Sequence, residues 1–268
     1  MTKDNLDAVR RHARLTPGYA ARVAAATDRL RRAADEHAPR IVQATSLSAE
    51  DMVVTDLVAR HRLPIAVATL DTGTLHAETL AMVPRIEAHY GLAVERFAPP
   101  AEAVVAFITR HGERSMYESV AQRKACCALR KLEPLARMLD GRDAWVTGLR
   151  RGQSAARAEV TFEEADENGR AKLNPLADWS EADVWHYLGE HGVPYNSLHD
   201  RYFPSIGCAP CTRAVALGED ARAGRWWWED ESAKECGLHV AEASRLPRWR
   251  DAATSALAAA DIDAEVPA

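Results

Sequence analysis

The chain has 268 residues, of which 47% are hydrophobic and 27% are charged, and its formal net charge is −5. This composition is typical of a globular protein with a sizeable core, and the negative charge does not favour nucleic acid or an anionic membrane as a partner. No stretch approaches the ~20 consecutive apolar residues of a membrane-spanning helix, and the charged N-terminus lacks the pattern of a secretory signal. We therefore expect a cytoplasmic protein that holds any anionic ligand with a local basic cluster.

Along the chain, short apolar runs alternate with segments whose apolar residues recur at helical spacing. The strand-like runs are 41–44, 65–70, 92–97 and 145–147. The helical segments are 17–36, 49–60, 75–90, 101–111 and 116–139. Repeated strand–turn–helix units predict an α/β fold with a mostly parallel sheet flanked by helices.

The second half of the chain is less regular. An Arg-rich loop at 148–157 precedes a predicted hairpin around Asp166–Gly169. Ser180 and Asp183 have the spacing of a capping box and should begin a helix. Loops dominate beyond about residue 195, and the Ala-rich stretch 252–268 is expected to fray. We divide the chain into an N-terminal helical segment (1–36), an α/β domain (37–230) and a loop-rich C-terminal segment (231–268).

Five cysteines are unevenly spaced: Cys126 and Cys127 are adjacent, Cys208 and Cys211 form a C-x-x-C motif, and Cys236 stands apart. An odd number without an export signal argues against a disulfide framework and for metal binding or reactive thiols. A C-x-x-C motif brings two sulfurs to one metal centre. Adjacent thiolates strain to reach one zinc ion, whereas a cubane offers them separate iron atoms. The spacing therefore favours a [4Fe–4S] cluster on the first four cysteines, while a structural zinc site and cysteines without a metal stay open.

Cations surround the cysteine pair, namely Arg123, Lys124, Arg130 and Lys131. Four thiolates would leave a cubane site net negative, so neighbouring cations would stabilise it. Lys131 could also link such a cluster to an anionic substrate. The alternative for each of these residues is a solvated basic face of a helix.

Six sequence motifs follow one another along most of the chain. They are KACCALRK (124–131), VTGLRRGQS (146–154), NPLADWSEADVW (174–185), GCAPCT (207–212), GEDARAGRWWWE (218–229) and KECGLH (234–239). In this order they resemble the assimilatory sulfonucleotide reductases, specifically the bacterial adenylyl-sulfate (APS) reductases. The resemblance implies an adenine nucleotide alpha hydrolase-like fold, related to that of the ATP pyrophosphatases, and a [4Fe–4S] cluster on the four cysteines.

The resemblance also implies a nucleotide site after the first two strands. Its phosphate loop would contain Ser46 and Ser48, where backbone N–H groups at the start of the next helix favour an anion. The loop lacks the glycines of related loops. Without the resemblance, Ser48 and Asp51 have the spacing of a capping box, which is the alternative interpretation of this segment. Asp71 and Gly73 belong to a segment, LDTG, that the resemblance puts near the nucleotide; the alternative is a simple turn.

Arginines are expected to hold the anionic part of the substrate. Arg150, Arg151 and Arg157 supply fixed charge that suits bidentate phosphate binding, and by resemblance their loop closes on the nucleotide. Arg222 and Arg225 are expected, on the same ground, to contact the phosphosulfate.

With four cysteines assigned to a cluster, Cys236 becomes the candidate nucleophile. His239 and the nearby arginines should lower the pKa of its thiol. Attack on the sulfur of APS would expel AMP and leave an S-sulfonate on Cys236, with Lys131 and His239 helping to neutralise charge. Because Cys236 has no internal partner, release of sulfite needs an outside dithiol, which the resemblance identifies as thioredoxin.

Three other functions compete with this interpretation. A reductase of the 3′-phosphorylated substrate, PAPS, or a dual-specificity reductase would share most of the site, although PAPS reductases typically lack the cluster cysteines. A tRNA-thiolating ATP pyrophosphatase calls for a glycine-rich loop and a basic surface, which this chain does not provide. A zinc-stabilised binding module leaves KECGLH without a role. The resemblance also implies a homo-oligomer.

Overall fold

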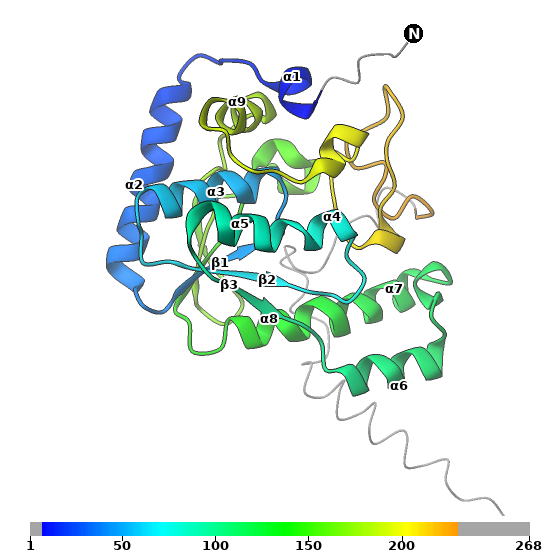
Figure 1. Ribbon diagram of the computed structural model, residues 1–268. Helices are drawn as coiled ribbons and strands as arrows, with labels where there is room; N and C mark the ends of the chain where they lie inside the picture. Colours follow the sequence, from blue (N-terminus) through cyan, green and yellow to red (C-terminus); the bar gives the residue numbers. More distant parts are fainter. Residues whose placement is uncertain (1–6, 230–268) are drawn as a thin grey trace, which may run out of the picture.

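The computed structural model describes residues 7–229, and its centre is a mixed β-sheet (Figure 1). Within the described residues the strands are ordered β3-β2-β1-β4-β6-β5. Neighbouring strands are parallel except for β5, which is antiparallel to β6. This confirms the predicted mostly parallel sheet. The strands are β1 (Ile41–Thr45), β2 (Ala66–Leu70), β3 (Val94–Phe97), β4 (Ala144–Val146), β5 (Glu163–Ala165) and β6 (Ala171–Leu173).

Both faces of the central strands are buried, because successive residues of a strand point to opposite sides and apolar residues lie on both. Ile41 and Val67 join the larger core, whereas Val42 and Trp145 join a smaller one with Met138. Figure 1 shows α3 and α5 on one side of the strands and α8 on the other. The larger core packs against α2 (Tyr19–His37), α3 (Ala49–Arg60), α5 (Met82–Tyr90) and α9 (Glu181–His191), and the smaller against α8 (Glu133–Met138).

Two of the predicted helices are interrupted. Proline accounts for the break in the first and for the π-helical turn in the second, whereas the extended backbone of Ser119 separates η1 from α7. Pro84 and Pro134 carry no N–H, so neither can donate to the carbonyl four residues earlier. The predicted helix 75–90 is therefore split in two, and the predicted helix 116–139 is split into several parts. These parts are α4 (Ala77–Leu80) and α5 in the first case, and η1 (Ser115–Tyr117), α7 (Val120–Cys127), the π-helical turn η2 (Ala128–Leu132) and α8 in the second.

The other predicted elements lie close to their expected positions. α3 spans the predicted residues 49–60, and α6 (Ala101–His111) follows β3 as expected. At the start of α9 the Asp183 N–H donates to Ser180 Oγ at 3.1 Å, and the Ser180 N–H donates to Asp183 Oδ2 at 2.8 Å, which confirms the capping box. A short helix that the sequence did not predict, α1 (Ala8–His12), precedes α2. The described helices are all too short or too polar to cross a membrane.

The order of the strands determines where a ligand can bind. The chain runs outward from β1 through β2 to β3, and then returns to the opposite side of β1 to form β4. The loops that leave β1 and β4 therefore diverge, which opens a crevice at the carboxyl ends of these neighbouring strands.

Candidate active site

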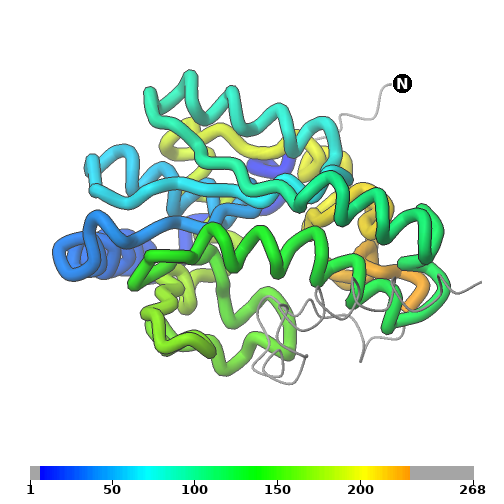
Figure 2. The backbone as a smooth tube through the Cα atoms, turned by 90° about the horizontal axis from the view of Figure 1, so that it is seen from below, coloured from blue at the N-terminus to red at the C-terminus, as the bar shows by residue number. Residues whose placement is uncertain are grey.

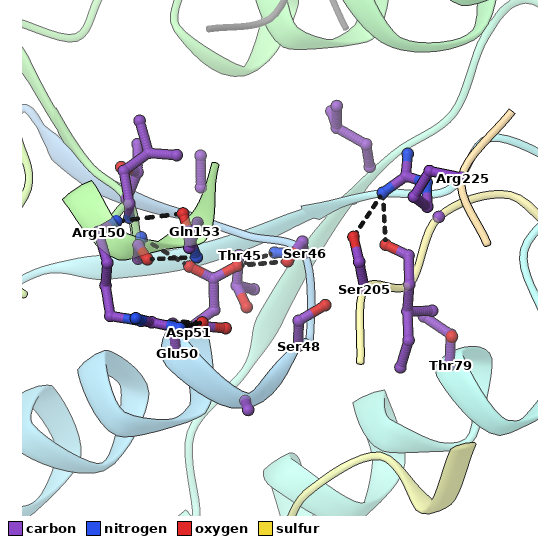
Figure 3. A pocket seen from close by; sticks show the side chains of 18 of the residues that line it. Thr45, Ser46, Ser48, Glu50, Asp51, Thr79, Arg150, Gln153, Ser205 and Arg225 are labelled. Atoms are coloured by element: carbon purple, nitrogen blue, oxygen red, sulfur yellow. Dashed lines mark hydrogen bonds and ion pairs between the residues drawn. The ribbon is translucent and has the colours of Figure 1, made fainter. Parts of the chain in front are cut away.

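A pocket of about 290 Å³ occupies this crevice. Figure 3 shows Arg150, Glu50 and Asp51 grouped at one side of it and Arg225 with Ser205 at the other. The predicted substrate-binding residues that line the pocket are Ser46, Ser48, Lys131, Arg150, Arg157, Arg222 and Arg225. The tertiary structure thus brings most of the predicted substrate-binding residues together.

Asp51 joins the two loops that form the floor of the pocket. Its carboxylate accepts hydrogen bonds from the N–H and Oγ of Ser46, at 2.6 and 2.5 Å, and from the Gly148 N–H at 2.8 Å. A Cβ on Gly148 would lie 2.6 Å from Asp51 Oδ1, so only glycine allows this approach. Burial raises the pKa of Asp51 to about 6. The capping-box interpretation of Ser48 and Asp51 is wrong, because the Ser48 side chain makes no capping bond and Asp51 bonds across the pocket instead.

Arg150 is part of a buried ion pair. Its Nε and Nη2 donate to Glu50 Oε1 at 3.0 and 2.7 Å, and its backbone N–H donates to Gln153 Oε1 at 3.1 Å. Burial opposes ionisation of Glu50, but the charge of Arg150 and the hydrogen bond from Gln153 outweigh it and lower the pKa. Arg157 Nη1 donates to the same Gln153 oxygen at 2.7 Å. Arg150 therefore forms part of the pocket wall with its charge already balanced.

Three of the predicted substrate-binding residues, Arg151, Asp71 and Gly73, do not line the pocket. Arg151 Nε donates to the Val160 carbonyl at 2.8 Å, and its guanidinium lies over the Phe162 ring. The Gly73 N–H donates to Asp71 Oδ1 at 3.0 Å, which is a local turn. Between these two residues, Thr72 lines the pocket instead.

The four described cysteines gather at the Lys131 and Arg225 end of the pocket. Cys126, Cys208 and Cys211 are buried in a cluster with Met116 and Trp226, and Cys127 follows Cys126 at the end of α7. The C-x-x-C motif forms a tight turn, in which the Cys211 N–H donates to the Cys208 carbonyl at 2.9 Å. We call this region the cysteine lobe, comprising α6, α7, η2 and residues 205–229. In Figure 2 the yellow-to-orange segment that ends at residue 229 lies beside the green helices of the lobe.

The electrostatic environment differs between the two cysteines of the motif. Burial opposes ionisation of Cys208, but Lys131, the hydroxyls of Thr72 and Thr74 and then Arg225 outweigh it and lower the pKa of this thiol. Burial, and next the neighbouring Cys208, raise the pKa of Cys211 to about 12. Over residues 7–229 we find no three Cys, His, Asp or Glu side chains grouped so as to hold a single metal ion.

Sequence reasoning missed the role of Glu50 and one buried histidine. His199 lines the pocket at its α9 end, is 4% exposed, and has no hydrogen-bond partner for either ring nitrogen among the described residues. Burial lowers the pKa of His199 to about 4, so the ring is neutral near pH 7. Nothing in the local sequence signals this residue, because the chain from Ser197 to Arg201 reads only as a loop.

Cys236 and His239, the predicted catalytic residues, lie outside the described residues.

Comparison with known proteins supplies the family. Residues 40–214 match the phosphoadenosine phosphosulfate reductase domain. The adenosine 5′-phosphosulfate reductase of Allochromatium vinosum is 57% identical over 209 residues, which are 77% of this chain and 82% of that protein. The enzyme of the same name from Burkholderia cepacia is 51% identical over 234 residues, 87% of this chain and 93% of its own.

Solved structures agree with this assignment. A phosphoadenylyl-sulfate (PAPS) reductase from Candida auris superposes with a TM-score of 0.61 at 26% identity, covering 75% of this chain and 98% of its own. Yeast FAD synthetase, at a TM-score of 0.51 and 13% identity over 77% of this chain and 73% of its own, shares the fold alone. These neighbours confirm the predicted adenine nucleotide alpha hydrolase-like fold. The chain belongs to the phosphoadenosine phosphosulfate reductase domain family, and its relatives named above are adenosine 5′-phosphosulfate reductases.

Proposed function

We propose that this protein reduces APS to sulfite and AMP in sulfate assimilation, the route to cysteine, with thioredoxin as the electron donor. One observation carries the proposal: the cationic end of the pocket, at Lys131, Arg222 and Arg225, is also the edge of the cysteine lobe. The names of the closely similar relatives agree with it.

The pocket offers separate places for the two parts of the substrate. Lys131, Arg222 and Arg225 would hold the phosphosulfate, because guanidinium and ammonium groups donate charge-assisted hydrogen bonds to such oxygens. Ser46 and Ser48 precede α3, whose N-terminal N–H groups favour a phosphate. At the other side of the pocket Arg150 is already paired with Glu50. The uncharged nucleoside would lie between these two regions.

The cysteine lobe fits an iron–sulfur cluster. Cys126, Cys127, Cys208 and Cys211 form a soft sulfur donor set of the kind that such clusters use. Apolar side chains exclude water around three of them, and Lys131 and Arg130 supply positive charge beside them. When bound, a [4Fe–4S] cluster would support the structure of the lobe, and its negative charge would attract the neighbouring cations. The electrons for the reaction come from thiols.

In the first step, the Cys236 thiolate attacks the sulfur of APS. A bond forms between the thiolate and that sulfur, while the bond from sulfur to the phosphate oxygen breaks and AMP leaves with its electron pair. Lys131, Arg222, Arg225 and His239 would neutralise the charge that moves onto the leaving phosphate.

In the second step, one thiol of thioredoxin attacks the sulfonated Cys236 and displaces sulfite. A mixed disulfide results, and the second thioredoxin thiol then frees Cys236. The dithiol loses two electrons, and the sulfonate sulfur gains them. This chemistry requires a reducing compartment, which agrees with a cytoplasmic location.

PAPS is the alternative substrate, alone or together with APS. It is favoured by the name of the matching domain and by the Candida auris enzyme. The two substrates differ by a 3′-phosphate on the ribose, so parallel assays with both compounds distinguish these possibilities.

The test is an anaerobic preparation assayed for sulfite release from APS and from PAPS with reduced thioredoxin. We expect the rate of sulfite release to fall more than about 10³-fold in Cys236→Ser. Its iron content and visible absorbance should equal those of the wild type, because only the nucleophile is changed. An active Cys236→Ser enzyme would contradict the nucleophile. A colourless wild-type protein with one bound zinc would contradict the cluster.

A further inference from the structure

Two guanidinium groups lie over the ring of Trp226, which is buried in the cysteine lobe. Arg123 lies 4.6 Å from its ring centroid and Arg225 lies 4.5 Å away. Its backbone has a φ of 41°, which is unusual for a bulky residue and requires support from its surroundings. That support includes a hydrogen bond from the Trp226 N–H to the Cys211 carbonyl at 3.1 Å.

Three residues further on, Glu229 forms a buried ion pair with the same Arg123. Arg123 Nε donates to Glu229 Oε1 at 2.9 Å, and Nη2 donates to Oε2 at 2.7 Å. The two side chains are only 1% and 3% exposed. Bidentate geometry fixes direction as well as distance. Because desolvation offsets much of the attraction in a buried pair, such a pair contributes more to a defined geometry than to net stability.

The pair joins two parts of the proposed active site. Arg123 is on α7, the helix that ends at the two adjacent cysteines. Arg225 and Trp226 line the substrate pocket. The short segment from Arg225 to Glu229 is therefore attached both to the pocket wall and to the cysteine helix.

We propose that Arg123 and Glu229 anchor the C-terminal segment that carries Cys236 and are positioning residues for the nucleophile. Cys236 is the seventh residue after Glu229. A fully extended chain of that length spans at most about 25 Å, so the anchor limits how far the thiol can move from the pocket wall. A short tether from a fixed point gives the thiol a high effective concentration at the substrate. This inference rests on the proposed role of Cys236.

The test measures the first chemical step by itself. Enzyme is mixed with saturating APS without thioredoxin, and the S-sulfonate on Cys236 is followed by mass spectrometry. We expect Glu229→Ala to slow its formation at least tenfold, with AMP affinity and iron content within twofold of wild type. Glu229→Gln, which keeps an acceptor for Arg123, should recover most of the rate. The matched control is Glu219→Ala in the same segment, where the ion pair with Arg213 is more than a third exposed, and it should change none of these values.

A second variant leaves the buried pair intact and therefore does not threaten folding. Fourteen Gly and Ser residues inserted after Glu229 triple the tether, and we expect them to slow S-sulfonate formation about fivefold. A rate within twofold of wild type in both Glu229→Ala and the insertion variant overturns the anchor. The anchor is also overturned if Glu229→Ala loses AMP affinity or iron together with the rate of S-sulfonate formation, because loss of a merely structural ion pair would produce that result. If wild-type enzyme itself forms no adduct at Cys236, the proposed function fails first, and the anchor fails with it.

Discussion

The two ends of the pocket are built in different ways. At one end, the floor follows directly from β1 and β4. Its buried groups are held by hydrogen bonds that the Ser46 and Gly148 N–H groups donate to the Asp51 carboxylate, and by the Arg150–Glu50 pair. At the other end, the cysteine lobe consists of short irregular segments, including a π-helical turn, a 3₁₀ turn at 209–211 and a tryptophan with positive φ.

This difference indicates which interactions each end depends on. Parallel strands satisfy their backbone groups through the sheet, so the strand-end floor uses side chains such as Asp51 to join the loops that leave the strands. The cysteine lobe has little regular backbone pairing, and its described core is small. It relies on specific side-chain contacts such as Arg123–Glu229 and, in our proposal, on a cluster. Substitutions should therefore affect binding of the nucleotide at one end and chemistry at the other.

The largest effect should come from removing a charge at the lobe end. Arg225→Met keeps most of the side-chain volume but removes a cation that would face the phosphosulfate, and we expect kcat/KM for APS to fall about 10²-fold. The matched control is Arg151→Met, because Arg151 does not line the pocket and bonds to the Val160 carbonyl. Steady-state assays of the two variants check this. A loss below threefold in Arg225→Met, or an equal loss in both variants, would contradict it.

An intermediate effect should come from crowding the strand-end floor. In Gly148→Ala the new methyl group would lie 2.6 Å from Asp51 Oδ1 and 2.9 Å from its backbone nitrogen, so one loop must move. We expect a loss of about 1–3 kcal/mol in the free energy of unfolding and weaker AMP binding. Gly152→Ala is the control on the same loop, since its nearest contact is 3.5 Å. Urea unfolding and AMP titration measure both effects, and equal values for the two variants would rule out the proposed clash.

The last prediction distinguishes two buried groups at the strand-end side of the pocket by the pH dependence of their contributions to stability. Asp51 has a folded pKa near 6, above the usual 3.8, so its stabilising contribution is complete below pH 3.8 and is lost as pH rises through 6. His199 has a folded pKa near 4, below the usual 6.5, so its contribution is complete above pH 6.5 and is lost as pH falls through 4. Each contributes up to about 3 kcal/mol across its window.

Replacing either group should therefore tilt the stability profile in opposite directions. Relative to wild type, Asp51→Asn should become more stable as pH rises from 4 to 7. His199→Gln should instead become more stable, relative to wild type, as pH falls from 7 to 4. Urea unfolding at several pH values measures these slopes. Profiles parallel to that of wild type would show that neither group titrates as described.

The fold was largely predictable because its signals are local. Apolar strands and the helix over residues 49–60 follow from hydrophobic periodicity, and the Ser180–Asp183 capping box is a four-residue pattern. The long helix predicted over 116–139 failed, because periodicity does not register the missing N–H of Pro134 or the extended Ser119 that begins α7. The same limit explains the split of the helix predicted over 75–90.

The site was predictable in its residue types but not in its pairings. The motifs identified most of the pocket-lining arginines and the four cysteines, and the family resemblance identified Ser46 and Ser48. They did not reveal that Arg150 is balanced by Glu50, a residue 100 positions earlier, or that Asp51 bonds to Gly148, 97 positions later. His199 escaped notice because only packing makes it a pocket residue.

The sequence by itself therefore determined the family, the fold class and the chemical groups available, since these depend on composition, local periodicity and motif order. Only the tertiary structure decided where each charge lies and which groups of the described residues it contacts. The physical reason is that pairing depends on burial and on contacts between distant segments. Arg150 and Arg225 are both buried arginines in family motifs, yet one is neutralised by Glu50 while the other stacks on Trp226 at the edge of the cysteine lobe.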